Sequence, residues 1–208
     1  VSADTGGLAP PPVEPAVDSA KLPETSSPPS RLRSSETVPT TRLGIGLGSA
    51  LGIGTLPGLG AGFVGAVTLR HHGARLGVHG TFWLRQRPMY APGAGASFDM
   101  AELGVFGCYT TTLRELAVGP CANLEATVMR VEGFGIRMPR ASWSRWPTAG
   151  LGARGEVRLS RWLVMYVRAD LLFPIDAPDF TLGRSGVVLH RPALAAGRFG
   201  LGAEIVLP

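Results

Sequence analysis

Apolar and polar residues alternate along most of the chain after Thr41. A period of two is typical of β-strands, because successive side chains of a strand point to opposite faces. The alternation predicts eight strands, at residues 43–54, 60–70, 75–86, 98–110, 119–130, 149–159, 162–173 and 194–207. Each is long enough to cross a membrane as a tilted strand, which takes roughly 9–11 residues.

The two faces of these predicted strands differ in composition. One face carries Leu, Ile, Val, Phe and Met without a charge in mid-strand, as in Leu43, Ile45 and Leu47. The opposite face carries charges of both signs that nearly cancel, as buried charges must if they are to stay ionised. We expect these residues to form a network inside the protein: Arg75, Arg85, Glu102, Glu125, Arg154, Glu156, Arg158, Arg168, Asp170, Arg198 and Glu204.

Alternation alone does not decide which face points outward. A soluble barrel turns its apolar face inward, whereas a membrane barrel turns it toward lipid. Glycines favour the second arrangement, because Gly44, Gly46 and Gly48 share the register of the charged face. The lumen of an eight-stranded barrel is barely wide enough for its own side chains, so glycines there would make room for arginines.

The predicted connections alternate between short and long. They are short at 71–74 and 160–161, intermediate at 111–118, and long at 87–97, 131–148 and 174–193, with 55–59 as a short exception. Short turns on the periplasmic side and longer loops outside are typical of outer-membrane barrels. This pattern places both termini in the periplasm.

The sequence therefore predicts an all-β fold, an eight-stranded antiparallel up-and-down transmembrane β-barrel over residues 42–208. Residues 1–41 are rich in Pro, Ser, Thr and Glu, and we expect a disordered periplasmic linker there. Two other folds compete with this prediction. One is a soluble ligand-binding β-barrel. The other is a transmembrane helix hairpin over the uncharged stretch 43–69, which is long enough to span a membrane. Pro57 and the glycines at every second position argue against the helix hairpin.

Composition is consistent with contact to lipid. Hydrophobic residues make up 45% of the chain and charged residues 17%, against about 25% charged residues in an ordinary soluble domain. The net charge of +5 raises the question of nucleic-acid binding, but the arginines are spread through the alternating pattern instead of forming basic runs. We therefore expect no nucleic-acid partner.

Two motifs bear on covalent structure and cofactors. Cys108 and Cys121 fall on the same face of consecutive predicted strands, which suits a cross-strand disulfide in an oxidising compartment. Residues 60–65 match G-x-G-x-x-G, but a dinucleotide site needs a helix after the motif and here a strand pattern follows. We expect no cofactor and no metal site.

Arginines are also frequent in the two longest predicted loops, with Trp143 and Trp146 between them. They could bind lipopolysaccharide phosphates, because the guanidinium group matches phosphate geometry: Arg137, Arg140, Arg145, Arg184 and Arg191. The alternative is ordinary solvated loop arginines, with the tryptophans at the membrane interface.

A hydrolytic site at the outer rim is a different hypothesis. His190 lies in the last long loop with Asp176 and Asp179, and these residue types could carry general acid–base chemistry. Of the other histidines, His71 and His72 fall in a predicted turn. His79 falls on the charged face, where we expect a structural hydrogen bond.

In strand number, loop asymmetry and separation of the two faces, residues 42–208 resemble the small eight-stranded outer-membrane barrels, which include the membrane domain of outer-membrane protein A. The paired cysteines also resemble those of barrels from GC-rich Gram-negative bacteria. Many barrels of this kind end in an aromatic residue, whereas this chain ends in Leu207 and Pro208. The resemblance implies a lipid environment in the outer membrane of a Gram-negative bacterium. It also implies a non-enzymatic structural, adhesive or envelope-stabilising role.

Overall fold

The computed structural model describes residues 41–135, 141–181 and 188–207, and the predicted linker at 1–41 lies outside them except for Thr41. Eight long strands form the barrel: β1 (Arg42–Ile53), β2 (Gly60–His71), β3 (Ala74–Trp83), β5 (Ala94–Tyr109), β7 (Leu116–Phe134), β8 (Ala141–Arg158), β9 (Leu163–Pro174) and β12 (Ala196–Val206). Four short strands lie in the connections: β4 (Met89–Ala91), β6 (Thr111–Leu113), β10 (Phe180–Thr181) and β11 (Val188–His190).

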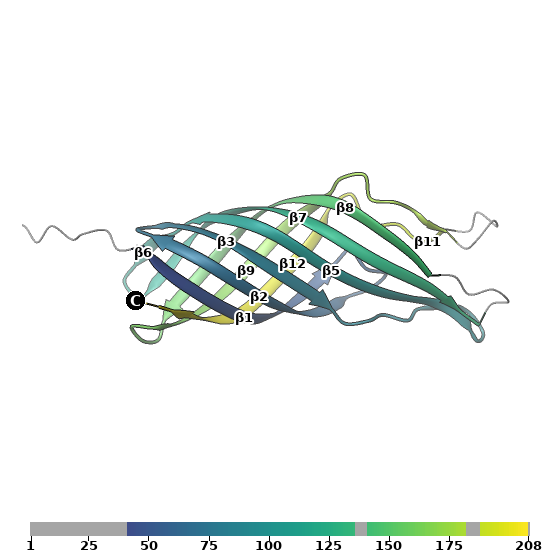
Figure 1. Cartoon of the computed structure of the whole chain (residues 1–208), viewed down its shortest axis with the longest axis horizontal. Coiled ribbons are helices and arrows are strands. Elements are labelled where there is room, and N and C mark those ends of the chain that lie inside the picture. The colour runs from purple at the N-terminus through teal and green to yellow at the C-terminus, as the bar shows by residue number, and fades with distance from the viewer. Residues whose placement is uncertain (1–40, 136–140, 182–187, 208) are drawn as a thin grey trace, which may run out of the picture. The chain divides into compact units, whose positions relative to one another are not determined.

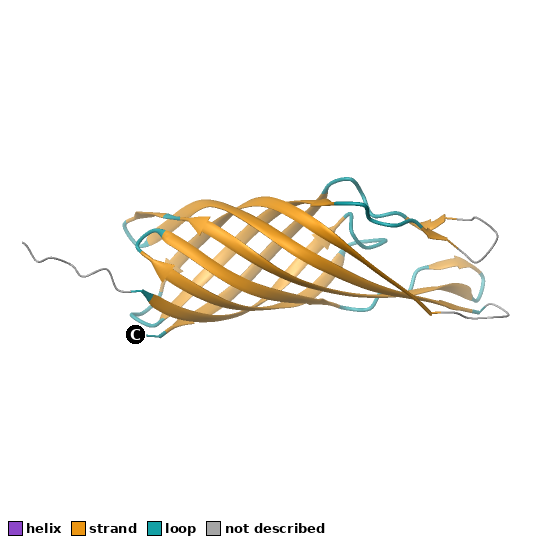
Figure 2. Ribbon diagram, turned by 45° about the horizontal axis from the view of Figure 1, so that its top comes forward, coloured by secondary structure: helices purple, strands orange, loops and turns teal. Residues whose placement is uncertain are grey.

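The eight long strands form a closed antiparallel barrel, as the alternation predicted (Figure 1). Each pairs with its neighbour along the chain, and β12 returns to pair with β1, with Gly48 opposite Gly202. Closure leaves no unpaired edge in the barrel wall, and the strands cross it at a tilt (Figure 2).

The barrel has two different ends. At the end where β1 begins and β12 ends, which we call the turn end, β2 connects to β3 through His72 and Gly73. At the opposite end, the loop end, β9 connects to β12 through a long segment that contains the β10–β11 hairpin. These two connections follow the predicted alternation of short and long.

The predicted long loops contain more strand than the sequence suggested. The interval 131–148 was expected to be a loop, but β7 and β8 continue through it as a paired hairpin, with Val131 opposite Ser142 and Glu132 opposite Ala141. The prediction was wrong because these two strands satisfy each other's backbone groups beyond the apolar part of the barrel. There, lipid no longer selects apolar side chains at every second position.

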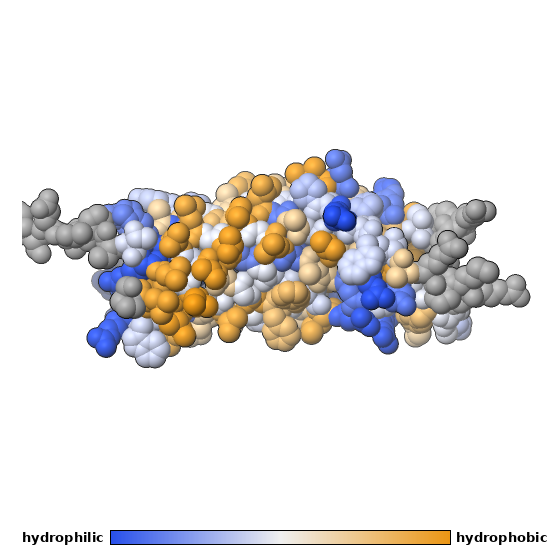
Figure 3. Space-filling model, viewed as in Figure 1, coloured by the Kyte–Doolittle hydropathy of each residue, from blue (hydrophilic) through white to orange (hydrophobic). Residues whose placement is uncertain are grey.

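The apolar face of the strands points outward. Leu47 is 72% exposed, Phe82 68% and Leu103 68%, and these residues lie on three different strands. Figure 3 shows apolar side chains over the strands and hydrophilic ones toward the two ends. A soluble barrel would bury this face, so that alternative is contradicted.

The helix-hairpin alternative is also contradicted, because residues 43–69 lie in β1, β2 and the turn between them. Among the described residues, no helix is long and apolar enough to span a membrane.

Candidate functional site

The lumen contains ion pairs between charged residues of several strands. Its wall is built from the inward positions of each strand, and its contents form three layers along the barrel axis. A first group of ion pairs lies near the turn end, a second group lies in the middle, and an apolar cluster closes the loop end.

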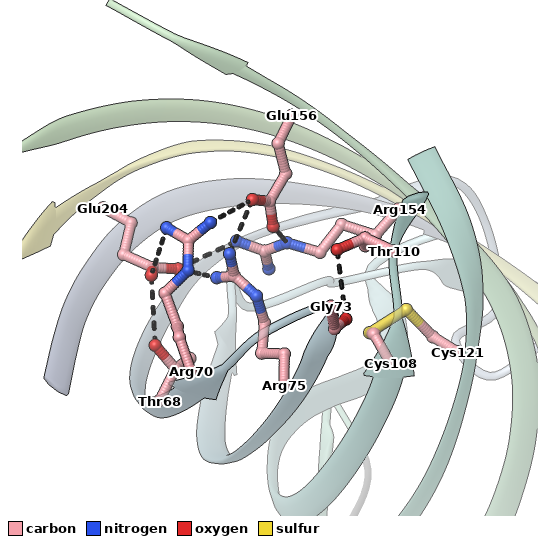
Figure 4. A network of polar contacts seen from close by, with 10 residues as sticks. All are labelled: Thr68, Arg70, Gly73, Arg75, Cys108, Thr110, Cys121, Arg154, Glu156 and Glu204. Carbon is pink, nitrogen blue, oxygen red and sulfur yellow. Dashed lines mark hydrogen bonds and ion pairs between the residues drawn. A yellow bond between two sulfur atoms is a disulfide. The ribbon is translucent and has the colours of Figure 1, made fainter. Parts of the chain in front are cut away.

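The first ion-pair group joins β3, β8 and β12 (Figure 4). Glu156 accepts hydrogen bonds from Arg75 and from Arg154, both at 2.5 Å. Glu204 accepts from the same two arginines, at 2.9 Å from Arg154, and from the Thr68 hydroxyl at 3.1 Å. The two carboxylates therefore bind two buried guanidinium groups from several sides, which is the arrangement that keeps buried charges paired.

The second ion-pair group is centred on Arg198. Its guanidinium donates to Glu102 at 3.1 Å, to Glu125 at 2.9 Å and to Asp170 at 3.1 Å, so it links β12 with β5, β7 and β9. Asp170 also accepts from Arg168 at 2.9 Å. One guanidinium thus connects four strands across the lumen.

Aromatic rings lie against one arginine of each group. The Arg154 guanidinium lies 3.9 Å from the ring centroid of Tyr166, and that of Arg168 lies 4.9 Å from the centroid of Phe106. Such cation–π contacts contribute about 2 kcal/mol when they are desolvated. His79, which was expected to make a structural hydrogen bond, lies 3.2 Å from a Glu125 oxygen.

At the loop end the lumen is filled by apolar side chains. Trp83, Phe98, Met129 and Trp146 extend inward from β3, β5, β7 and β8, and Phe180 of β10 packs onto them. The ring centroids of Phe180 and Phe98 are 6.2 Å apart, and those of Phe180 and Trp146 are 6.3 Å apart. This layer was not predicted from the sequence, because Trp146 and Phe180 lie in predicted loops and Phe98 lies at the edge of one.

Inward glycines make this filling possible. A Cβ on Gly52 would lie 2.5 Å from the ring of Trp83, and a Cβ on Gly44 would overlap the Glu204 carboxylate. Between these layers the described side chains leave small voids. A cavity of about 30 Å³ lies among His79, Tyr166 and Arg168, enough for a water or two.

Nine of the eleven residues expected in the charged network lie in these two groups, and two do not. Arg85 follows the end of β3 and pairs on the outside with Asp99 at 2.6 Å, with 49% of its side chain exposed. Arg158 is the last residue of β8, where the inward register opens to solvent at the turn end. Arg70 was missed, although it lies on the inward register of β2 and donates to Glu156 at 3.0 Å.

Cys108 and Cys121 form the predicted disulfide. They face each other directly in the β5–β7 pairing, and both are buried in the lumen. The bond lies beside Phe106 and next to the first ion-pair group (Figure 4).

The proposed catalytic residues at the rim are not brought together. His190 Nε2 donates to the backbone carbonyl of Thr55 at 2.8 Å, and its ring stacks on Phe180. Asp179 instead accepts two hydrogen bonds from Arg191, which lower the pKa of that carboxyl below its usual range. The described residues therefore contain no contact between His190 and an aspartate.

The candidate lipopolysaccharide contacts are only partly described. Arg137, Arg140 and Arg184 lie outside the described residues. Arg145 is exposed on the outward face of β8, two positions from Trp143, whose side chain is 68% exposed. Arg191 is paired with Asp179, and this hydrogen bond raises the pKa of its guanidinium.

Comparison with known proteins identifies the architecture. No family model and no curated protein matches the chain. A major outer membrane protein from Thermus thermophilus has a similar structure, with a TM-score of 0.62, 13% identity, and coverage of 81% of this chain and 100% of that one.

Two further solved structures are similar at lower scores. Neisserial surface protein A gives a TM-score of 0.48 at 12% identity, over 79% of this chain and 96% of that one. The N-terminal β-barrel domain of Pseudomonas aeruginosa OprF gives 0.47 at 9% identity, over 80% and 97%. The fold is that of the small eight-stranded outer-membrane β-barrels.

Proposed function

We propose that this chain is a non-enzymatic barrel of a Gram-negative outer membrane, with a structural, adhesive or envelope-stabilising role and a lumen closed to ions. The observation that carries the proposal is the separation of the two faces of the wall. Charged side chains inside are paired with one another, and the outward face of the strands is apolar. A wall of this kind is stable only if its outward face meets lipid.

Aromatic side chains at the two ends of the wall support a membrane location. Tyr109 and Trp162 are exposed near the turn end, at 66% and 52%, and Trp143 is exposed near the loop end. Tyrosine and tryptophan are enriched at both membrane–water interfaces, because their rings have an apolar body and a polar group. Tyr109 and Trp162 would mark the border of the spanning region at the turn end.

The filled lumen supports a role without transport or catalysis. Five arginines meet five carboxylates inside the wall, in the sets Arg70, Arg75, Arg154, Arg168 and Arg198 with Glu102, Glu125, Glu156, Asp170 and Glu204. The loop end above them is closed by an apolar cluster. An eight-stranded barrel filled in this way leaves no continuous aqueous path.

Orientation follows from the two ends. Short turns in outer-membrane barrels face the periplasm, so the turn end would lie there and the loop end outside. In this orientation residues 1–41 would act as a periplasmic tether, and residues 42–208 would form the membrane domain. Outer-membrane lipids would surround the wall, and lipopolysaccharide would be a partner at the outer rim.

Site-specific labelling on intact cells tests location and orientation together. Leu194 at the loop end is 92% exposed, and Ser160 lies in the short connection at the turn end. We expect Leu194→Cys to react with a maleimide on a polymer too large for porins, and Ser160→Cys to react only after the outer membrane is permeabilised. If Ser160→Cys reacts in intact cells and Leu194→Cys does not, the orientation is the opposite of the proposed one. Recovery of the protein in the soluble fraction without detergent would refute the membrane location.

A further inference from the structure

The outer wall has a cavity near the loop end that the proposed role does not use. Its volume is about 360 Å³, and it lies between the segment that follows β3 and the end of β7, across β5. The residues that line it are Arg85, Arg87, Ser97, Glu132, Gly133 and Phe134. It opens on the outside of the barrel, because Ser97 shares its strand face with Leu103, which is 68% exposed.

Ser97 is the buried polar group of this cavity. Its side chain is 8% exposed, and its hydroxyl has no hydrogen-bond partner among the described residues. A buried hydroxyl without a partner costs about 1–3 kcal/mol, so such groups are found where a water or a ligand completes them. The cavity therefore contains a hydrogen-bond donor that no described protein group uses.

The charges around the cavity favour an anion. Arg85 donates only its Nε to Asp99, which leaves its terminal nitrogens available, and this bond raises the pKa of the guanidinium. Arg87 is exposed, and no ion-pair partner for it is present in the described ranges. The one carboxylate of the lining, Glu132, is already bound by Arg130 at 2.8 Å. The cavity thus offers two arginines and a hydroxyl as donors, and the charge of its one carboxylate is already balanced by an ion pair.

The height of the cavity on the wall identifies the kind of molecule that would carry the anion. Along the outward face of β5, apolar residues end at Ala101, and Asp99 and Ser97 follow. The boundary of the apolar part lies between Ala101 and Asp99, and Ser97 is about three residues of strand beyond it, which is about 10 Å of strand or about 7 Å of height at a tilt near 45°. The head-group region of a bilayer occupies roughly 5–8 Å beyond the hydrocarbon on each side. Ser97 would therefore lie at the level of lipid head groups.

We propose that this cavity binds a phosphate group of an outer-leaflet glycolipid, with Arg85, Arg87 and the Ser97 hydroxyl as donors. Arginine matches phosphate with two parallel hydrogen bonds, and a serine hydroxyl adds a third donor. The proposal rests on the proposed membrane location and orientation, since only then does the loop end meet the outer leaflet. It would fix one lipid molecule against β5 and β7.

Binding of lipopolysaccharide to the folded, detergent-solubilised full chain tests the proposal. We expect Arg87→Gln to weaken binding about tenfold, as loss of one charged hydrogen-bond donor does, and Ser97→Ala to weaken it by a smaller factor. Arg158→Gln is the matched control, because it removes an exposed arginine at the turn end and should bind like the wild type. Heat-dependent gel mobility verifies that each variant is folded.

Three results would overturn the inference. They are equal binding by the wild type and Arg87→Gln, undiminished binding of lipopolysaccharide from which the phosphates have been removed, and inorganic phosphate alone binding as tightly as the lipid. Cell labelling at Leu194 and Ser160 tests the proposed function separately. A correctly oriented membrane barrel that failed the lipid-binding test would refute only the phosphate site.

Discussion

Individual charged residues in the lumen act through several strong contacts at once. Glu156 binds Arg75 and Arg154 at 2.5 Å each and Arg70 at 3.0 Å, while only 3% of its side chain is exposed. Removing one member of a buried ion pair leaves its partners charged and unpaired. The network should therefore be far more sensitive to single substitutions than to the exchange of solvent-exposed charges.

Glu156→Ala tests how much the buried ion-pair network contributes to stability. We expect it to lower the free energy of unfolding by about 3–5 kcal/mol, the usual cost of breaking a buried ion pair. Urea-dependent unfolding of the reconstituted barrel measures this difference. Arg158→Ala, two positions along the same strand but exposed, should change stability by no more than about 0.5 kcal/mol. Equal stability of Glu156→Ala and the wild type would contradict the network.

The strand face of most charged residues could be predicted from the sequence. The inward register was correct for most of the network, because a period of two fixes the face of each side chain within a strand. It failed at strand ends: β3 ends at Trp83, so Arg85 no longer follows its inward register, and Arg158 lies at the open rim. Arg70 was omitted from the network although the register places it inward, at the last position of the predicted strand 60–70.

At the scale of elements, the β5–β7 pair is joined both by its backbone ladder and by the disulfide between Cys108 and Cys121. Closing a loop of this length contributes roughly 3 kcal/mol in the chain-entropy model. We expect the double variant Cys108→Ala, Cys121→Ala to unfold at lower urea concentration than the oxidised wild type. Reductant should shift the wild type toward the variant and leave the variant unchanged. Identical unfolding of the oxidised wild type and the variant would contradict a stabilising bridge.

The β10–β11 hairpin closes the loop end through Phe180, which is 5% exposed and contacts the buried ring of Trp146. We expect Phe180→Ala to expose Trp146 to water, which shifts its fluorescence to longer wavelength and increases quenching by acrylamide. Substituting phenylalanine for Trp143 and Trp162 removes the two exposed tryptophans from the signal. Val188→Ala, on the exposed side of the same hairpin, is the control.

An unchanged spectrum in Phe180→Ala would show that the hairpin does not cover the lumen. Sequence reasoning could not have found this contact. A single aromatic residue in a long connection has no periodic pattern to place it, and only the closed barrel brings it over Phe98 and Trp146.

For the whole molecule, the fold was predictable and the extent of its strands was not. Apolar residues at every second position mark the part of each strand that faces outward over the central wall, which fixed the strand number and order. Beyond that part, β7 and β8 continue with Arg130, Trp143 and Arg145 on their outward faces. These residue types are as common in loops as in solvated strands, so the pattern alone could not distinguish the two.

We propose that the whole molecule is a membrane barrel whose lumen is closed by its own side chains. Ion current across a planar lipid bilayer that contains the folded wild-type protein tests this proposal most directly, with folding and insertion verified by heat-dependent gel mobility of the same preparation. The paired lumen charges and the apolar cluster at the loop end predict a current no larger than that of the lipid alone. A large, steady conductance from the inserted wild-type barrel would contradict the account.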